Sequence, residues 1–217
     1  LLLGMGHKVS GSDRVTTAET DRMQKLGLMF SSPHTAEAVK DAEIVVFSSA
    51  IRPQNPAYAA AVAGGIPLYR RAECLAAILH TRKGIVISGT HGKTTTSSMT
   101  AHVLREAALD PSHYVGAEIP ILGANAKWSE QGEFMVAEGD ESDGTLALYR
   151  PEHSVILNIE AEHLDFYRDL DHIREVFGKL ADQTRGKLVY CAEDPVAAEM
   201  CEGRGNAVSY GWEEADY

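Results

Sequence analysis

Short apolar runs alternate with amphipathic stretches along most of the chain. The apolar runs are rich in β-branched residues and predict buried strands, at residues 44–47, 85–87, 134–137, 154–159 and 187–190. Shorter extended pieces predict further strands, at residues 8–13, 27–30 and 66–68. Apolar positions at helical spacing predict the intervening helices, at residues 20–26, 35–40, 55–64, 71–80, 94–109, 171–184 and 194–200. Strands that alternate with helices build βαβ units, so we expect an α/β fold with parallel sheets.

The order of these elements divides the chain into two domains. Repeated strand–helix units over residues 1–80 predict an N-terminal Rossmann-like domain with a parallel sheet, and a second domain follows over residues 81–217. The chain opens on Leu1 with the end of a helix and a glycine turn. We therefore expect the first strand and the glycine loop of a βαβ unit to be missing, and we interpret the chain as a fragment.

Composition narrows the class of partner. The 217 residues carry 20 Lys and Arg against 31 Asp and Glu, a net charge of −11. Nucleic-acid binding needs clustered Lys and Arg, so this balance argues against a nucleic-acid partner. No apolar run approaches the length of a membrane span, which argues against a membrane partner. Three cysteines without metal-ligand spacing indicate reduced thiols, so we expect a cytoplasmic protein.

The most informative stretch is the glycine-rich loop between the strand at 85–87 and the helix at 94–109. Backbone N–H groups of such a loop, together with a helix N-terminus, bind phosphate groups. We expect a nucleotide to be held by seven residues, Gly89, Thr90, His91, Gly92, Lys93, Thr94 and Thr95. Lys93 would reach the β- and γ-phosphates of ATP and Thr94 would ligate Mg²⁺. The strict P-loop pattern has glycine where Ile87 stands, and the alternative is an ordinary strand–turn–helix.

Acidic residues follow the next buried strand, and a histidine follows the one after it. Glu138, Asp140, Glu141 and Asp143 are four carboxylates within six residues, and packed carboxylates attract a cation. The alternative is a solvated acidic loop. His163 lies after the strand at 154–159, so its side chain and that of Glu138 could converge at one edge of the sheet.

Polar residues also follow two strands of the N-terminal domain. Asp13 ends an early strand, where dinucleotide folds place a carboxylate against a ribose hydroxyl. Ser49 and Ala50 follow the strand at 44–47, at the edge where open α/β sheets bind ligands. The alternatives are a turn or cap for Asp13 and an ordinary loop for Ser49 and Ala50.

Six stretches in order resemble the ATP-dependent Mur ligase family of cell-wall synthesis. They are G-S-D at 11–13, S-S-A-I at 48–51, R-R-A-E at 70–73, G-T-H-G-K-T-T-T at 89–96, D-E-S-D at 140–143 and N-I-E-A-E-H-L-D at 158–165. The chain departs mildly from the family at Gly139, usually alanine, and at Glu162, usually aspartate. The resemblance implies a Rossmann-like UDP-binding domain, then a central P-loop-type ATPase domain, with the family's C-terminal domain absent.

The resemblance also implies an activity. Its nearest branch joins L-alanine to the lactyl carboxylate of UDP-N-acetylmuramate, using ATP and Mg²⁺ and passing through an acyl phosphate, in peptidoglycan precursor synthesis. The catalytic residues implied are Lys93, Glu138 and His163, with Thr94, Glu138 and His163 as metal ligands. Asp13, His34, Ser49 and Ala50 are the implied UDP-substrate residues.

The alternatives are a murein-peptide recycling ligase of the same fold, which tends to have tyrosine at Ser142, and a non-catalytic UDP-sugar- or nucleotide-binding protein. The oligomeric state stays open.

Overall fold

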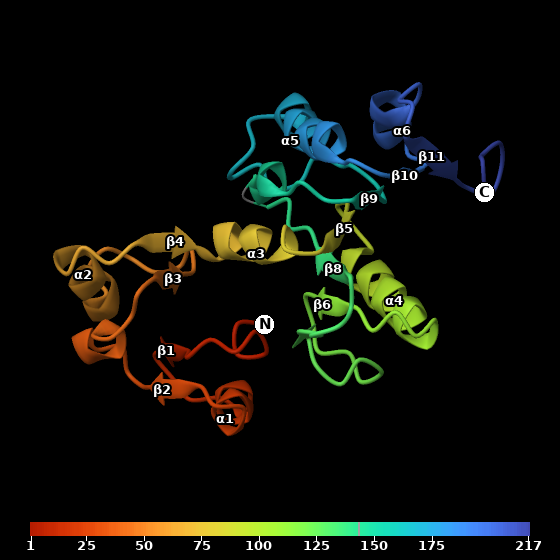
Figure 1. Cartoon of the computed structure of the whole chain (residues 1–217). Helices are drawn as coiled ribbons and strands as arrows, with labels where there is room; N and C mark the ends of the chain where they lie inside the picture. The colour runs from red at the N-terminus through yellow and green to blue at the C-terminus, as the bar shows by residue number, and fades with distance from the viewer. Residues whose placement is uncertain (143) are drawn as a thin grey trace. The chain divides into compact units, whose positions relative to one another are not determined.

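A computed structural model describes residues 1–142 and 144–217 of the chain, which form two compact units (Figure 1). Unit 1 is Leu1–Leu75 and unit 2 is Ala76–Tyr217, so the boundary falls inside one helix. The functional division into domains at residue 80 stays a prediction.

Unit 1 contains two separate two-stranded parallel sheets, where the sequence predicted one parallel sheet. Its elements are β1 (Ser10–Ser12), α1 (Ala18–Lys25), β2 (Met29–Ser31), the 3₁₀ turn η1 (Ala36–Val39), β3 (Val45–Phe47), α2 (Pro56–Ala63), β4 (Leu68–Arg70) and the start of α3 (Arg71–Leu79). β1 pairs with β2, and β3 pairs with β4. The parallel pairing is confirmed, whereas the helix predicted at residues 35–40 is a single 3₁₀ turn.

Helix α2 forms where its sequence predicts it. The Asn55 side chain caps its N-terminus by accepting hydrogen bonds from the N–H groups of Ala57 and Tyr58, and Gly65 follows its end with a left-handed φ of 65°. Ala57 and Ala61 pack with Val39 in a small core, against which Val45 and Leu68 also lie.

The prediction that residues 44–47 form a buried strand is wrong in its burial. Ile44 is 51% exposed and Val46 is 36% exposed. A two-stranded sheet covered by helices on one side buries only alternate side chains. Within unit 1 the core cluster covers the face that carries Val45 and leaves the opposite face of β3 open.

Unit 2 is built on a seven-stranded sheet in the order β11-β10-β9-β5-β8-β6-β7. Its strands are β5 (Lys83–Ser88), β6 (Ser112–Tyr114), β7 (Ala126–Lys127), β8 (Phe134–Glu138), β9 (His153–Ile156), β10 (Leu188–Cys191) and β11 (Ala207–Tyr210). Its other elements are α4 (Lys93–Glu106), the 3₁₀ turn η2 (Thr145–Leu148), α5 (Leu170–Gln183) and α6 (Pro195–Cys201). All neighbouring strands pair in parallel except β6 and β7. Figure 1 shows α4 on one side of this sheet and α5 and α6 on the other.

The apolar run of the central strand, β5, is buried as predicted. Val86 and Ile87 of β5 and Met135 and Val136 of β8 have no exposed surface. Two covered faces explain the continuous apolar run. The amphipathic pattern of α5 is also confirmed, because the apolar residues at helical spacing are buried, namely Ile173, Val176, Phe177 and Leu180.

Helix α4 presents a different face to the sheet from the one its apolar spacing suggests. Met99 and Val103 are 61% and 62% exposed, whereas Ser97, Ser98 and Ala101 are buried. Small side chains allow the helix to approach the sheet closely. The two serine hydroxyls are satisfied within the helix, since they donate to the carbonyl oxygens of Lys93 and Thr94.

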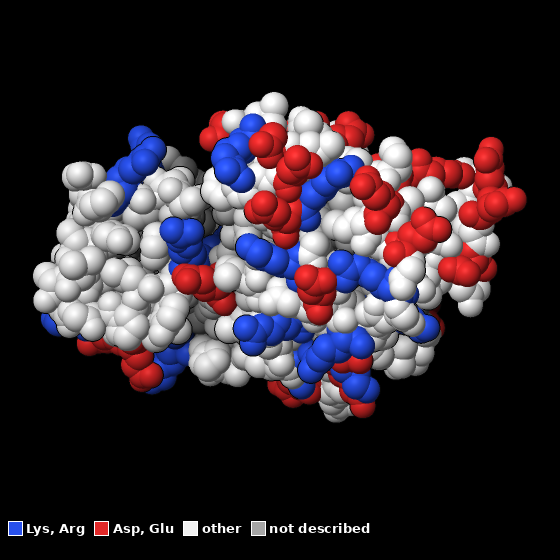
Figure 2. All heavy atoms as spheres, turned by 90° about the horizontal axis from the view of Figure 1, so that it is seen from above, with Lys and Arg blue, Asp and Glu red and all other residues white. Residues whose placement is uncertain are grey.

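Charged side chains of both signs are interspersed on the face shown in Figure 2. In the described parts of the chain, residues 1–142 and 144–217, no helix combines the length and apolar character needed to cross a membrane.

Candidate nucleotide-binding site

The loop between β5 and α4 depends on two glycines. Gly92 precedes the first residue of α4 with a left-handed φ of 81°, which glycine adopts without strain. Gly89 has a φ of 144°, and a Cβ there would lie 2.9 Å from the Cβ of Leu157. The loop therefore needs glycine at both positions for its backbone to turn against the strand end of β9.

An open hollow of about 350 Å³ lies over this loop and the first turn of α4. It is lined by Glu138 and by six of the seven predicted nucleotide residues, namely Thr90, His91, Gly92, Lys93, Thr94 and Thr95. The first N–H groups of a helix have no partner within the helix and carry partial positive charge. No side chain caps α4, so this hollow suits an anion such as a phosphate group.

Lys93 holds its ammonium group inside the loop. Its Nζ donates to the carbonyl oxygens of Gly89 (2.7 Å) and Thr90 (3.0 Å) and to Oε1 of Glu141 (2.8 Å). The Lys93 side chain is 16% exposed and that of Glu141 only 5%. Lys93 and Glu141 thus form a largely buried ion pair across the site.

Glu138 is fixed by two donors from different elements. Its Oε1 accepts from the hydroxyl of Thr94 at 3.0 Å, and its Oε2 accepts from the backbone N–H of Gly116 at 2.7 Å. A hydroxyl beside a carboxylate at the mouth of this glycine loop offers the oxygen ligands that Mg²⁺ prefers.

His163 lies against Glu141 rather than against Glu138. Its Nε2 is 3.4 Å from Oε1 of Glu141, and its backbone is in the left-handed region with a φ of 53°. The Tyr167 hydroxyl donates to the backbone oxygen of Glu141. Oε2 of Glu141 is buried without a hydrogen-bond partner among the described residues.

The structure therefore separates the three predicted metal ligands: Thr94 lies against Glu138, whereas His163 lies against Glu141, which was not predicted as a ligand. Among residues 1–142 and 144–217, no three histidine, cysteine, aspartate or glutamate side chains gather as a metal-binding group. Mg²⁺ does not require such a group, because it is usually bound through one or two carboxylates, phosphate oxygens and water. Of the four clustered carboxylates, Asp143 lies outside the described residues.

The predicted UDP-site residues lie in unit 1, after the ends of three strands. Asp13 follows β1, and its Oδ1 accepts from the N–H groups of Arg14 and Val15. His34 follows the neighbouring strand β2, and its Nδ1 is 2.8 Å from the hydroxyl of Ser12. Ser49 and Ala50 lie exposed after β3, in the other sheet of the unit. The structure therefore brings Asp13 and His34 to the edge of one sheet, and Ser49 and Ala50 to the edge of the other.

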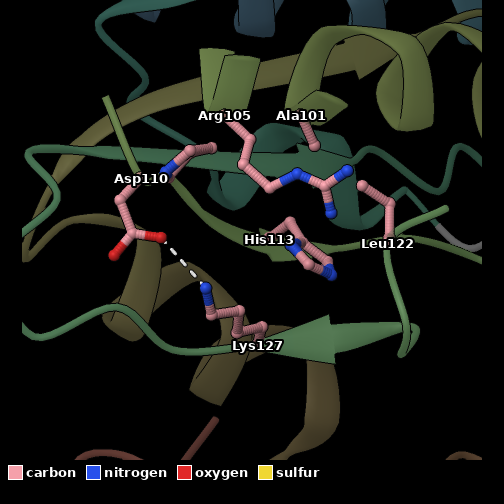
Figure 3. A pocket seen from close by; sticks show the side chains of 7 residues that line it. Ala101, Arg105, Asp110, His113, Leu122 and Lys127 are labelled. Carbon is pink, nitrogen blue, oxygen red and sulfur yellow. Dashed lines mark hydrogen bonds and ion pairs between the residues drawn. The ribbon is translucent and has the colours of Figure 1, made fainter. Parts of the chain in front are cut away.

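A second, much smaller cavity in unit 2 lies between the C-terminal half of α4 and β6 (Figure 3). Its volume of about 30 Å³ suits a single water molecule rather than a nucleotide. His113 and Arg105 point toward it, and Lys127 beside it pairs with Asp110 at 2.9 Å. Burial is the main cause that lowers the pKa of His113, and its Nε2 donates to the carbonyl of Ala124.

Three contributors to the site were not identified by sequence reasoning. Glu141 was grouped with the acidic cluster but not paired with Lys93, and Gly116 and Asn158 were given no role. Only Gly116, a glycine directly after a short strand, carries a local signal of close approach. The partners of the other two are 48 and 67 residues away in sequence.

Two protein-family models match most of the chain. Residues 87–217 match the model of the Mur ligase middle domain, and residues 1–83 match that of the Mur ligase family catalytic domain. The chain is 46% identical over 197 residues to the UDP-N-acetylmuramate–L-alanine ligase of Syntrophobacter fumaroxidans, covering 89% of this chain and 42% of that protein. It is 40% identical to the corresponding ligase of Syntrophotalea carbinolica, covering 100% of this chain and 48% of that protein. The chain thus spans about half the length of the curated relatives it matches.

Two solved structures are similar over 99% of the chain. One is the UDP-N-acetylmuramate–alanine ligase of Thermotoga maritima, with a TM-score of 0.87, 28% identity and 49% of that chain covered. The other is the UDP-N-acetylmuramate:L-alanyl-γ-D-glutamyl-meso-diaminopimelate ligase of Neisseria meningitides, with a TM-score of 0.88, 25% identity and 74% covered.

Proposed function

Because this chain belongs to the Mur ligase family, we propose that the complete protein is the ligase that joins L-alanine to UDP-N-acetylmuramate in peptidoglycan precursor synthesis. The reaction consumes ATP and yields ADP and phosphate through an acyl phosphate of the lactyl carboxylate. It takes place in the cytoplasm. The observation that carries this proposal is the 46% identity to a curated L-alanine ligase over 89% of the chain.

The fold alone does not separate this function from the nearest alternative. TM-scores to the L-alanine ligase and to the peptide-adding ligase are almost equal, at 0.87 and 0.88. Sequence similarity supports L-alanine, because the curated relatives described above, at 40–46% identity, are named for that amino acid. A peptide-recycling ligase therefore remains the second candidate.

The loop between β5 and α4, which lies beneath the hollow, is proposed to bind the phosphates of ATP. Gly89, Gly92 and the first turn of α4 would present N–H groups to the phosphate oxygens. Lys93 would keep its bonds to the carbonyl oxygens of Gly89 and Thr90, exchange Glu141 for a phosphate oxygen, and place its charge on the transferred phosphoryl group. Glu141 keeps this ammonium group at the loop before nucleotide arrives.

The donor set at the loop fits a magnesium ion. Thr94 and Glu138 would hold one Mg²⁺ through oxygen atoms. His163 is proposed as a ligand of a second on the family resemblance alone, because Mg²⁺ prefers oxygen to an imidazole nitrogen. The buried Oε2 of Glu141, which lacks a partner among the described residues, supports a need for positive charge close to His163. Bound Mg²⁺ supplies positive charge that offsets the charge on the transferring phosphoryl group.

The N-terminal unit is proposed to bind the UDP part of the substrate. Asp13 and His34 follow adjacent parallel strands, which is where open α/β sheets bind nucleotides. Ser49 and Ala50 follow β3 and offer a hydroxyl and a small apolar side chain, while the N–H of Ala50 donates to the Ser48 hydroxyl. These four residues would orient the sugar nucleotide, whereas the chemistry takes place at the loop of unit 2.

Phosphate release from ATP by the complete protein tests this function. With UDP-N-acetylmuramate present, L-alanine, L-serine, glycine and a tripeptide are added in turn. Release that needs the sugar nucleotide and is fastest with L-alanine supports the proposal. Release only with the tripeptide would assign the protein to peptide recycling, and no release with any amine would indicate a binding protein.

A pair of lysine variants links the activity to the loop. Lys93→Ala should reduce turnover by roughly 10²–10³-fold or more while leaving binding of UDP-N-acetylmuramate intact. Lys83→Ala is the matched control, because Lys83 is an exposed lysine of the same unit that pairs with Glu133 at the surface. Equal turnover in the two variants would contradict the assignment of the loop.

A further inference from the structure

Four hydrogen bonds tie the phosphate-binding loop to the segment that follows β9. The Asn158 side chain accepts from the N–H of His91 through Oδ1 (2.7 Å) and donates to the carbonyl of His91 through Nδ2 (3.1 Å). The backbone oxygen of Asn158 accepts from the N–H of Thr90 at 3.0 Å. The Thr90 hydroxyl accepts from the N–H of Glu160 at 2.9 Å.

Two of these bonds lie on peptide groups whose other ends face Lys93. In the peptide group between Gly89 and Thr90, the N–H donates to the backbone oxygen of Asn158 and the carbonyl oxygen accepts from the Lys93 ammonium. In the next peptide group, between Thr90 and His91, the N–H donates to Oδ1 of Asn158 and the carbonyl oxygen accepts from Nζ of Lys93. Both peptide groups therefore bridge Asn158 and Lys93.

This arrangement fixes the direction of both carbonyl groups. A peptide group is planar, so an N–H that is held on one side points the carbonyl to the opposite side. The loop contains two glycines and would otherwise have little resistance to rotation of these peptides. A hydrogen bond accepted from the N–H also polarises the carbonyl at the other end.

We propose that Asn158 is a positioning residue that sets the resting place of the Lys93 ammonium through these two peptide groups. The role rests on the proposed function, in which Lys93 acts on the phosphates of ATP. Asn158 bonds to the loop and does not line the hollow over it. It keeps the loop in the one shape in which Lys93 is held beside the phosphate hollow.

A coupling experiment on the complete protein tests this role, with the dissociation constant of Mg·ADP measured by calorimetry. Asn158→Ala should weaken Mg·ADP binding about tenfold while leaving binding of UDP-N-acetylmuramate unchanged. In a Lys93→Ala background the same substitution should have little further effect, because the group that Asn158 positions is gone. Asn158→Leu, which keeps the size of the side chain but removes both of its bonds to His91, is the second variant and should show the same coupling.

Asn206→Ala is the matched control. The Asn206 side chain also bonds to the backbone, donating to the carbonyl oxygens of Thr184 (3.1 Å) and Gly186 (2.9 Å) in the same unit. Its loss should lower the thermal midpoint without changing the affinity for Mg·ADP. A purely structural Asn158 would behave in the same way as this control.

The outcomes separate the two proposals. If Asn158→Ala binds Mg·ADP as tightly as the wild type, or loses the same factor with and without Lys93, the positioning role is overturned and the ligase assignment is unaffected. If the wild-type protein binds no Mg·ADP, the proposed function fails, and this role fails with it.

Discussion

The carboxylate of Glu138 lies directly against the backbone of Gly116. The N–H of Gly116 donates to Oε2 at 2.7 Å, and a Cβ added to Gly116 would lie 2.7 Å from Oε1 and 2.9 Å from Oε2. Gly116 therefore both holds this carboxylate and leaves the space that it occupies beside Thr94.

Gly116→Ala should move the Glu138 carboxylate away from Thr94 without unfolding the protein, because a carboxylate is the free end of a side chain. We expect a fall in turnover of about tenfold or more and a higher Mg²⁺ concentration at half-maximal rate. Phosphate release measured against Mg²⁺ concentration checks this. Gly178→Ala, in α5 and without heavy atoms near its Cβ, should retain wild-type kinetics. A wild-type Mg²⁺ response of Gly116→Ala would contradict the prediction.

The buried pair of Lys93 and Glu141 should affect stability as well as activity. Lys93→Met leaves the Glu141 carboxylate buried without its cation, so the free energy of unfolding should fall by about 3–5 kcal/mol. Adding Glu141→Gln should recover most of this loss, because no charge is then left unpaired. Urea unfolding of the two single variants and the double variant measures the coupling. Additive losses would show that the two groups act independently.

Gly139 is packed too tightly for the alanine that the family resemblance implies at this position. A Cβ would lie 2.7 Å from Cδ2 of Leu146 and 2.9 Å from Cγ1 of Val86. Gly139→Ala should lower the free energy of unfolding by about 1–3 kcal/mol through overpacking. Leu146→Val removes the Cδ2 atom, so the double variant should be more stable than the sum of the single changes predicts. Thermal or urea unfolding of the three variants decides this.

Acidification should destabilise the protein through His113. Burial holds the pKa of His113 below its ordinary value of about 6.5, and nearby Lys127 and Arg105 lower it further. The unfolded chain therefore binds the proton more readily than the folded protein. The contribution of His113 is complete above about pH 6.5 and is lost as the pH falls from there toward the lowered pKa.

Burial is also the main cause that lowers the pKa of His80, so His80 likewise makes the protein less stable as the pH falls. Urea unfolding at pH 7.5, 6.5 and 5.5 measures the loss, in a range where carboxylates stay ionised. His113→Gln keeps a donor for Ala124 but cannot titrate, so its stability should depend less on pH. An unchanged pH dependence in this variant would exclude His113 as a source.

Local sequence was sufficient wherever the decisive residues are neighbours in the chain. The strand, glycine turn and helix from β5 to α4 formed as predicted, because glycine conformations and apolar runs act over a few residues. The buried face of α5 was also predictable from helical spacing. The strand β11 and the short antiparallel strand β7 were not predicted, since two to four residues carry little pattern.

The sequence by itself determined the parallel α/β architecture, the glycine-rich loop and the residue types available for phosphate binding. Only the tertiary structure decided that Lys93 pairs with Glu141, that Gly116 holds Glu138 and that Asn158 supports the loop through His91. These partners are 48, 22 and 67 residues apart in the chain. The order of strands in the sheet selects which loops meet at its edge, and no local spacing encodes that order.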